Sequence, residues 1–229
     1  MNDDLIFEQL EIGPLQNLIY LVGSRSTGEA AIVDPAWDIN GMLEKAAHLS
    51  LKIKHIVATH AHPDHVGGSF MGMQVPGVAE LLEIVPSNVH VHVHPQDVEA
   101  LKALTGVVNE RISPIEDGGT LKIGSQTLEF IHTPGHSPGS VCILVEGQAI
   151  TGDTLFVGAC GRVDLPGGDP AALYDSLNIT LKALPDDTVI FPGHSYGGRT
   201  STIAEEKRSN YTFQVPTKAQ WLRMMGAPA

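Results

Sequence analysis

The residues that most restrict how this chain can fold stand at positions 59–65, which read Thr-His-Ala-His-Pro-Asp-His. Four of these seven positions carry side chains that can bind a metal ion: His60, His62, Asp64 and His65. An apolar run at 53–58 precedes them and predicts a short buried strand, and two glycines follow at 67–68. We therefore expect the four side chains on an irregular turn after a strand and not on a helix, which is where the HExxH zinc signature places its histidines. Imidazoles and a carboxylate suit zinc, iron or manganese, so this density favours a metal site over a polar surface loop.

The composition is that of a globular protein and excludes several classes of function. The chain has 229 residues, of which 42% are hydrophobic and 17% charged, enough for a sizeable core. Its net charge is −12 with no basic run, which argues against a nucleic-acid partner. No apolar stretch reaches the length of a membrane span, and residues 1–4, Met-Asn-Asp-Asp, are acidic where a signal peptide would be basic. Two cysteines are too few for a disulfide framework. We therefore expect a cytoplasmic protein with neither a membrane nor a nucleic acid as its partner.

The hydrophobic pattern divides the chain into two similar halves. The first half predicts strands at 5–12, 17–22, 30–33 and 53–58, with a helix near 39–47. The second half predicts strands at 120–123, 126–132, 140–145, 148–151 and 189–191, with helices at 170–184 and near Trp221. No linker separates the halves. The pattern therefore predicts one domain over residues 1–229, with a two-sheet core and helices outside.

Three further candidate ligands share the position of the first four in the pattern. His136, Asp153 and His194 each follow an apolar run, in a turn that contains glycine or proline. Because loops at one edge of a sandwich converge in space, we expect all seven side chains at one rim. Asp34 also ends a strand. Its carboxylate either caps the next turn or supports the segment 59–65, the metal loop, from beneath.

Three more histidines alternate with valines at 89–93. His90, His92 and His94 could be ligands, but strict alternation is typical of a half-buried strand with one apolar and one polar face. We therefore expect these histidines on the solvent side, with His92 or His94 at most lining the mouth of the cleft.

Together the motifs resemble those of the metallo-β-lactamase fold superfamily. His-X-His-X-Asp-His, Pro-Gly-His, Gly-Asp and Pro-Gly-His occur here in that order, and the resemblance covers nearly the whole chain. It implies an α/β (α+β) fold, a four-layer αββα sandwich of two mixed β-sheets flanked by helices. By position, it implies a first metal on His60, His62 and His136, a second on Asp64, His65 and His194, and Asp153 as the bridge. Two divalent ions are therefore expected, zinc first, with iron or manganese as alternatives.

Two groups within the superfamily compete as the nearer relatives. Residues 152–162 and His194-Ser195-Tyr196 are similar to hydroxyacylglutathione hydrolases (glyoxalase II), in which the tyrosine contacts glutathione. Residues 161–164 and 201–206 instead resemble persulfide dioxygenases and short glyoxalase II-like proteins. The dioxygenases use one iron but keep the other ligand positions, so the ligand set does not separate the groups. Residues 69–89 match neither group.

The resemblance to glyoxalase II implies a metallo-hydrolase. A metal-bound hydroxide would attack a glutathione-type thioester, and a thiolate whose conjugate acid has a pKa near about 8.5 leaves without a strong general acid. The alternatives are an iron-dependent persulfide dioxygenase, a hydrolase of lactones or other esters, and a non-catalytic metal-binding module. We expect a small-molecule substrate, with a glutathione conjugate as the first candidate. The oligomeric state is left open between a monomer and a homodimer.

Catalytic roles fall to Asp64, Asp153 and Tyr196, the last as a contact for the substrate. Arg199 and Lys207 are further candidates to bind a substrate carboxylate, although exposed charges in a tail are more often solvated.

Three residues near the third motif have open roles. Arg162 and Asp164 are expected to form an ion pair, which either supports the ligands or lies solvated on the surface. Cys160 has small neighbours, so we expect it to pack and not to act as a nucleophile.

Overall fold

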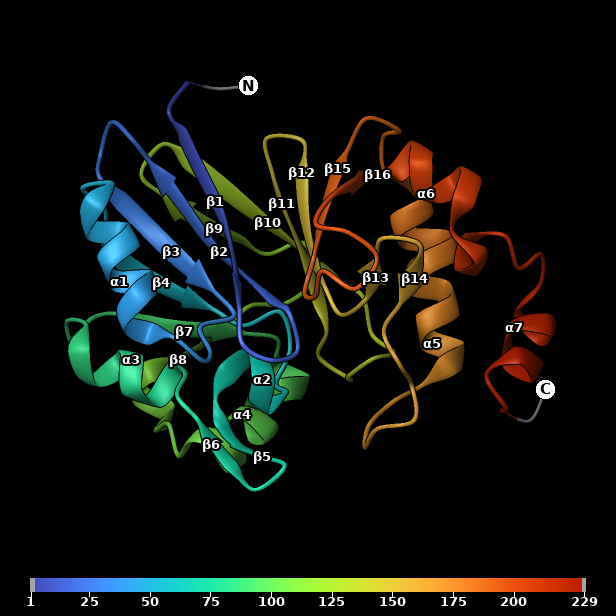
Figure 1. Ribbon diagram of the computed structural model, residues 1–229, viewed down its shortest axis with the longest axis horizontal. Helices are drawn as coiled ribbons and strands as arrows, with labels where there is room; N and C mark the ends of the chain where they lie inside the picture. The colour runs from blue at the N-terminus through green and yellow to red at the C-terminus, as the bar shows by residue number, and fades with distance from the viewer. Residues whose placement is uncertain (1–2, 228–229) are drawn as a thin grey trace.

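Two large mixed β-sheets packed face to face form the centre of the protein, whose structure is a computed structural model that describes residues 3–227 (Figure 1). The first sheet has the strand order β1 (Leu5–Ile12), β2 (Asn17–Ser24), β3 (Glu29–Val33), β4 (Lys52–Val57), β7 (His90–Val93) and β8 (Ile112–Pro114). The second has the order β16 (Ser201–Thr202), β15 (Val189–Pro192), β12 (Gln148–Gly152), β11 (Val141–Val145), β10 (Gln126–His132) and β9 (Thr120–Ile123). In the first sheet, β3 pairs with β4, β4 with β7 and β7 with β8, all in parallel. In the second sheet, β12 and β15 are parallel. The remaining pairs in both sheets are antiparallel.

Helices cover the outer face of each sheet. Those on the first sheet are α1 (Ile39–His48), α3 (Val78–Ile84) and α4 (Val98–Thr105). Those on the second are α5 (Pro170–Asp175), α6 (Ile203–Ser209) and α7 (Lys218–Met224). The predicted four-layer αββα sandwich is therefore confirmed. Within residues 3–227, no helix is both long and apolar enough to cross a membrane.

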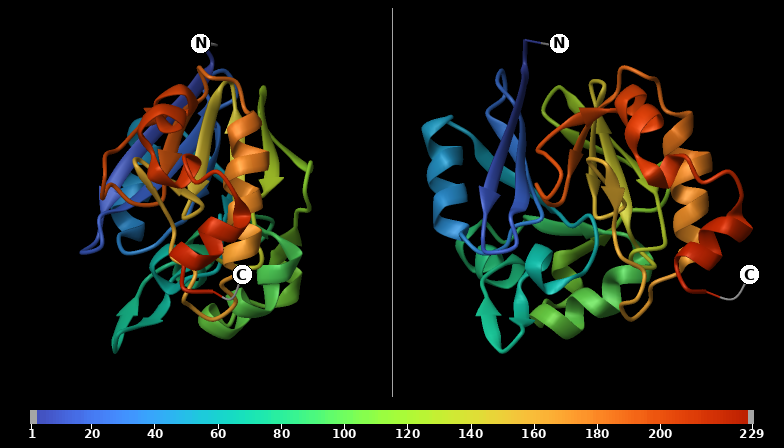
Figure 2. Two further views of the ribbon diagram at one scale, coloured as in Figure 1. Left: turned by 90° about the vertical axis from the view of Figure 1, so that its right-hand side faces the viewer. Right: turned by 45° about the vertical axis from the view of Figure 1, so that its right-hand side comes forward.

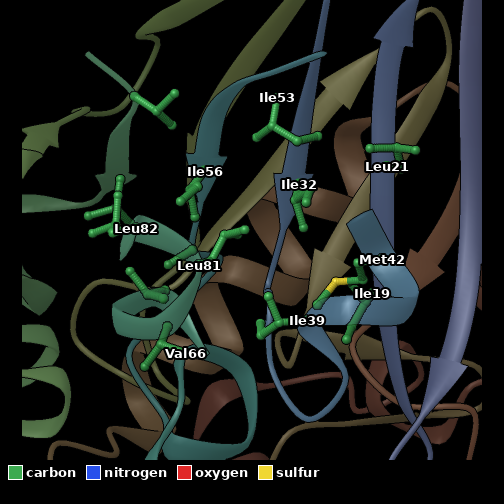
Figure 3. Close-up of a cluster of buried hydrophobic side chains, with 14 of the residues drawn as sticks. Ile19, Leu21, Ile32, Ile39, Met42, Ile53, Ile56, Val66, Leu81 and Leu82 are labelled. Carbon is green, nitrogen blue, oxygen red and sulfur yellow. The ribbon is translucent and has the colours of Figure 1, made fainter. Parts of the chain in front are cut away.

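Strand β2 shows why the central strands read as continuous apolar runs. Leu18 and Tyr20 point between the two sheets, whereas Ile19 and Leu21 point toward the helices. Figure 3 shows the outer cluster, in which Ile19 lies beside Met42 of α1. A strand buried on both faces needs apolar side chains at successive positions, which hides the alternation of a half-exposed strand.

The structure corrects two of the expected elements. Pro63–Val66 form a single helical turn, α2, so the expectation of a wholly non-helical turn is wrong for Asp64 and His65. Proline at the first helical position starts this turn, and the backbone N–H groups of His65 and Val66 both donate to the His62 carbonyl. The helix predicted at 170–184 is divided into α5, a π-helical segment (Ser176–Thr180) and a 3-10 turn (Leu181–Ala183).

Two short hairpins were not predicted. The first consists of β5 (Gly68–Phe70) and β6 (Met73–Val75), and the second of β13 (Leu155–Phe156) and β14 (Ala159–Cys160). Strands of two or three residues carry too little periodicity to be seen in a sequence.

His90 and His92 are on strand β7, as predicted, and His94 directly follows it, but His92 and His94 are not on the solvent side. His92 and His94 are only 6% and 7% exposed, so the expectation for these two is wrong. His92 Nε2 lies 3.0 Å from Nδ1 of His55 on β4, and the His94 ring stacks on His132 of β10 at 3.9 Å between centroids. The polar face of β7 therefore turns toward the second sheet.

Candidate metal centre

The seven predicted ligands meet at one rim of the sandwich, because each follows a strand whose end lies at that rim. His60 and His62 follow β4, and Asp64 and His65 lie on the helical turn α2. His136, Asp153 and His194 follow β10, β12 and β15, respectively.

The first group of donors consists of His60, His62 and His136, each offering a nitrogen within 4.8 Å of the others. His62 Nδ1 lies 2.9 Å from His136 Nε2. Within residues 3–227, the buried Nε2 atom of His60 has no hydrogen-bond partner. A metal ion can accept all three converging nitrogens as ligands, whereas the nitrogens cannot all satisfy one another by hydrogen bonds.

The second group consists of Asp64, His65 and His194, again with donor atoms within 4.8 Å of one another. His65 Nε2 lies 3.2 Å from His194 Nε2, and Asp64 Oδ2 lies 3.5 Å and 3.4 Å from these two nitrogens.

Asp153 lies between the two groups. Its Oδ2 atom is 3.5 Å from His136 Nε2 of the first group and 3.3 Å from His194 Nε2 of the second. Its Oδ1 atom is 3.4 Å from His65 Nε2. One carboxylate therefore faces both sets of donors.

Asp34 supports this arrangement from beneath. Its Oδ1 atom accepts from the Thr59 backbone N–H at 2.7 Å, and its Oδ2 atom accepts from the Thr59 hydroxyl at 2.7 Å and lies 3.0 Å from His65 Nδ1. Of the two roles that the sequence left open, the structure therefore places its carboxylate under the metal loop. Its φ of +56° is in the left-handed region, which aspartate tolerates better than most residues.

Backbone carbonyls orient two other imidazoles. His136 Nδ1 is 2.8 Å from the Arg162 carbonyl oxygen, and His194 Nδ1 is 2.9 Å from that of Leu15. A hydrogen bond at Nδ1 directs Nε2 toward the centre, which is how metal-binding histidines are usually fixed.

Three polar residues that the sequence did not indicate hold the ligand loops. Asn17 Nδ2 donates to Oδ2 and to the carbonyl of Asp64, and Trp37 Nε1 donates to the same carbonyl at 3.1 Å. The buried Asp97 carboxylate accepts from Ala61 N at 2.8 Å on one loop and from the Ser137 hydroxyl at 2.9 Å on the other. These residues come from distant parts of the chain and belong to no local motif.

Electrostatics favour the ligating protonation state of His60, His62 and Asp153. Burial holds the pKa of His60 well below its usual value and lowers that of His62 to about 4, so both imidazoles stay neutral. Although burial opposes ionisation of Asp153, His65 and His194 hold its pKa well below normal. Burial also opposes a charge on His65, but Asp153 and Asp64 raise its pKa, so a metal ion would compete with that proton. The donors present therefore fit divalent metal ions of the zinc or iron type.

A cavity of about 650 Å³ opens above the centre. Among its lining residues are the donors His62, Asp64, His136, Asp153 and His194. Tyr196 lines the mouth and stacks on His194, with 4.7 Å between ring centroids and 7° between planes. The predicted position of Tyr196 beside the centre is therefore found.

The other predicted residues divide between the rim and places elsewhere. Arg162 lines the cavity and forms the expected ion pair with Asp164, Nε to Oδ1 at 2.6 Å, with both side chains largely exposed. The Arg162 carbonyl, and not the ion pair, contacts His136, one of the predicted ligands. Arg199 binds Gln9 through Nε at 3.0 Å, and Lys207 binds Asp186 at 2.6 Å. Neither Arg199 nor Lys207 lines this cavity, so the structure does not support them as substrate contacts.

Comparison with known proteins agrees with this geometry. The hydroxyacylglutathione hydrolase GloC of Haemophilus influenzae is 35% identical over 188 residues, which cover 79% of this chain and 85% of that protein. The mitochondrial persulfide dioxygenase ETHE1 of Homo sapiens is 30% identical over 213 residues, covering 90% and 75%. The crystal structure of ETHE1 from Myxococcus xanthus matches with a TM-score of 0.81 at 29% identity, over 96% of this chain and 90% of that one. Residues 12–194 match the family described as the metallo-beta-lactamase superfamily, and this chain therefore belongs to that superfamily.

Proposed function

We propose that this protein is a metal-dependent hydrolase that cleaves a thioester, with a glutathione thioester as the first candidate. The observation that carries the proposal is the position of Asp153, whose carboxylate faces two complete groups of three donors beneath an open cavity. The similarity to a protein named as a hydroxyacylglutathione hydrolase supports the choice of substrate. We propose that the protein works on this small molecule in the cytoplasm, without a nucleic-acid or membrane partner.

Two bound divalent ions would supply an activated water at neutral pH and a Lewis acid for the carbonyl oxygen. The chain's own part is to hold the donors in place and to set their charge. The neutral imidazoles of His60 and His62 add no negative charge, whereas the carboxylates of Asp64 and Asp153 each add one. With two divalent ions bound, the centre would keep a net positive charge, which would favour the negative charge that develops on a carbonyl oxygen under attack.

The cavity walls give no sign of a protein nucleophile. Cys160 lines the cavity, but burial raises the pKa of its thiol to about 12, so the thiol stays protonated at neutral pH. This supports the prediction that Cys160 packs in the wall. Tyr196 is the candidate for a substrate contact. Burial raises the pKa of its hydroxyl, which therefore remains a hydrogen-bond donor.

Metal analysis of the purified protein tests the proposal, together with an assay of thioester hydrolysis and an assay of oxygen uptake with glutathione persulfide. We expect up to two metal ions per chain and hydrolysis of S-lactoylglutathione by zinc-loaded protein. The Tyr196→Phe variant should mainly raise KM, because a hydroxyl at the mouth binds the ground state and the transition state alike.

The second candidate is an iron-dependent persulfide dioxygenase. The similarity to two proteins named ETHE1, one of them over almost the whole of this chain, favours it. Oxygen uptake by iron-loaded protein with glutathione persulfide, together with no thioester hydrolysis by zinc-loaded protein, would overturn the hydrolase proposal in favour of this one.

A further inference from the structure

One wall of the cavity is formed by the β5–β6 hairpin, which projects from the body of the molecule (Figure 2). The base of this hairpin is fixed. Gly68 and Val75 pair there and are buried, and the backbone N–H of Trp37 donates to the Pro76 carbonyl at 2.9 Å. The ring of Phe70 packs edge-on against Trp37, with 6.3 Å between centroids. The hairpin is therefore anchored beside the metal centre, while its tip residue Met71 lines the cavity and is exposed to solvent.

The tip carries an unusual residue for its backbone. Met71 and Gly72 have φ values of +50° and +81°, as in the two-residue turn that normally takes Asn-Gly. The hairpin between β11 and β12 has the same pattern at Glu146 and Gly147, with φ values of +48° and +77°. There the first position carries a polar side chain. At the cavity it carries a methionine that is 86% exposed, and such an outlier points to a function for the side chain.

The chemistry of the cavity fits an apolar ligand at this wall. Phe70 and Met71 line it on one side, and Phe156 and Val157 are among the apolar residues that complete it. Among the lining residues, all of them in the described part of the chain, Arg162 is the only lysine or arginine, and its guanidinium is already bound to Asp164. A volume of about 650 Å³ also exceeds the space that a two- or three-carbon acyl group fills.

We propose that the β5–β6 hairpin is a specificity element that packs Phe70 and Met71 against an apolar acyl group longer than acetyl or lactoyl. This inference rests on the proposed thioester hydrolase function and names the substrate class of that same site. The polar thiol half of the substrate then lies toward the exposed rim of the cavity. Met71, a flexible side chain with a polarizable sulfur, can adapt to chains of different shape.

A series of glutathione thioesters that differ only in the acyl group tests the proposal by kinetics. From acetyl through butanoyl to hexanoyl, kcat/KM should rise about threefold to fourfold for each methylene that becomes buried. In Met71→Asn the ratio of hexanoyl to acetyl kcat/KM should fall about tenfold, and Phe70→Ala should lower it as well. Met73→Asn is the matched control, because Met73 is on the same hairpin but does not line the cavity, and it should leave the ratio unchanged. An equal kcat/KM for all acyl groups would overturn the proposal.

A binding measurement separates this inference from the proposed function. S-hexylglutathione and S-methylglutathione are thioethers that cannot be hydrolysed, and the protein can be prepared with isotope-labelled methionine methyl groups. We expect the hexyl compound to shift the Met71 methyl resonance in NMR spectra and the methyl compound to leave it in place. If no thioester is hydrolysed, the hydrolase proposal fails, while the Met71 shift still reports whether the hairpin binds an apolar chain. If Met71→Asn changes only the oligomeric state in light scattering, the hairpin is a contact between copies of the chain and the inference is overturned.

Discussion

Two hairpins contribute residues to the cavity wall, and they are held in very different ways. The β13–β14 hairpin is braced from behind by helix α6 and the residue that follows it. Glu206 Oε2 accepts from the Gly158 backbone N–H at 2.9 Å and from Asn210 Nδ2 at 2.7 Å, and Asn210 Nδ2 also donates to the Ala159 carbonyl at 3.0 Å. The side chains of Glu206 and Asn210, which brace the hairpin, are both buried, and this makes their hydrogen bonds costly to break.

The β5–β6 hairpin is fixed only at its base, and its tip residue Met71 is exposed to solvent. The braced hairpin begins two residues after Asp153, whose carboxylate must stay where both groups of donors can reach it. The other hairpin carries no predicted ligand. The difference indicates that one wall is built for precise placement of the reacting group, whereas the other can adjust to the part of the substrate that does not react.

The largest effect is expected at the start of the braced wall. Asp153→Ala removes the carboxylate that faces both groups of donors, so kcat/KM should fall by more than about a thousandfold, with a loss of bound metal. Asp164→Ala, at an exposed position of the same segment, is the control and should keep its metal. Full metal content and activity in Asp153→Ala would contradict the bridging role.

The two groups of donors can be separated by single substitutions in the segment that follows β4. His62→Ala removes a donor of the first group, and Asp64→Ala removes one of the second. Because each group then keeps two donors, we expect metal affinity to fall about tenfold to a hundredfold or more at the site affected. Elemental analysis checks this, and unchanged metal content in both variants would show that the assignment is wrong.

Removing the brace should move the fixed wall. Glu206→Ala removes the acceptor that the Gly158 N–H and the buried Asn210 amide share, which should lower the free energy of unfolding by about 1–3 kcal/mol. KM should rise, because Val157 and Phe156 lose their fixed positions in the cavity.

Glu206→Gln is the matched control for this brace, since its amide oxygen can still accept both bonds. Denaturant unfolding and steady-state kinetics check the pair. If Glu206→Ala is as stable and active as Glu206→Gln, the two hairpins do not differ in the way described.

Acid should weaken the sheet scaffold without acting through either hairpin. Burial, followed by the neighbouring His55, lowers the pKa of His92 to about 4, below the value of about 6.5 expected in the unfolded chain. The unfolded chain therefore binds more protons between these values, so stability should fall as the pH drops from about 6.5 toward 4, by on the order of 2 kcal/mol.

His92→Leu should reduce this pH dependence of urea unfolding, and His48→Leu, at an exposed helix position, should not. Comparing variants removes the contribution of the histidines at the metal centre.

Replacing His90, His92 and His94 together should leave the metal content unchanged, because none of the three belongs to the groups of possible ligands. A lost metal equivalent would make this strand a ligand source.

A residue of the fold or of the candidate site could be predicted from the sequence only where a local pattern of neighbouring residues marks its role. The seven candidate donors were predicted because four follow β4 in one motif and His136, Asp153 and His194 follow three other strands, so a local pattern reports a position at the shared rim. The sandwich followed from the same strands and helices. Asn17, Asp97 and Glu206 were missed, because their side chains act on residues far away in sequence and no local pattern marks them.

The errors have the same origin. Arg199 was a candidate contact for a substrate carboxylate because it is a cation in the tail, but its guanidinium binds Gln9 on β1. His92 and His94 were expected on the solvent side because alternation reports two faces of a strand and not what covers each face. The second sheet covers the face that carries these histidines, and only the packing of the whole chain decides this.

The smallest expected effect tests the comparison at the tip of the unbraced hairpin. Met71 has a φ of +50°, a conformation that asparagine adopts more readily, so Met71→Asn should raise the free energy of unfolding by about 0.5–1 kcal/mol and Tm by about 1–3 °C. Glu146→Asn, in the equivalent turn between β11 and β12, should give a similar gain with no change in acyl selectivity. A gain in stability at both turns, with loss of selectivity only at Met71, would mean that the methionine is kept for the substrate and not for the fold. Thermal unfolding that shows Met71→Asn to be less stable than the wild type would instead mean that Met71 packs, and that the tip is held as firmly as the braced wall.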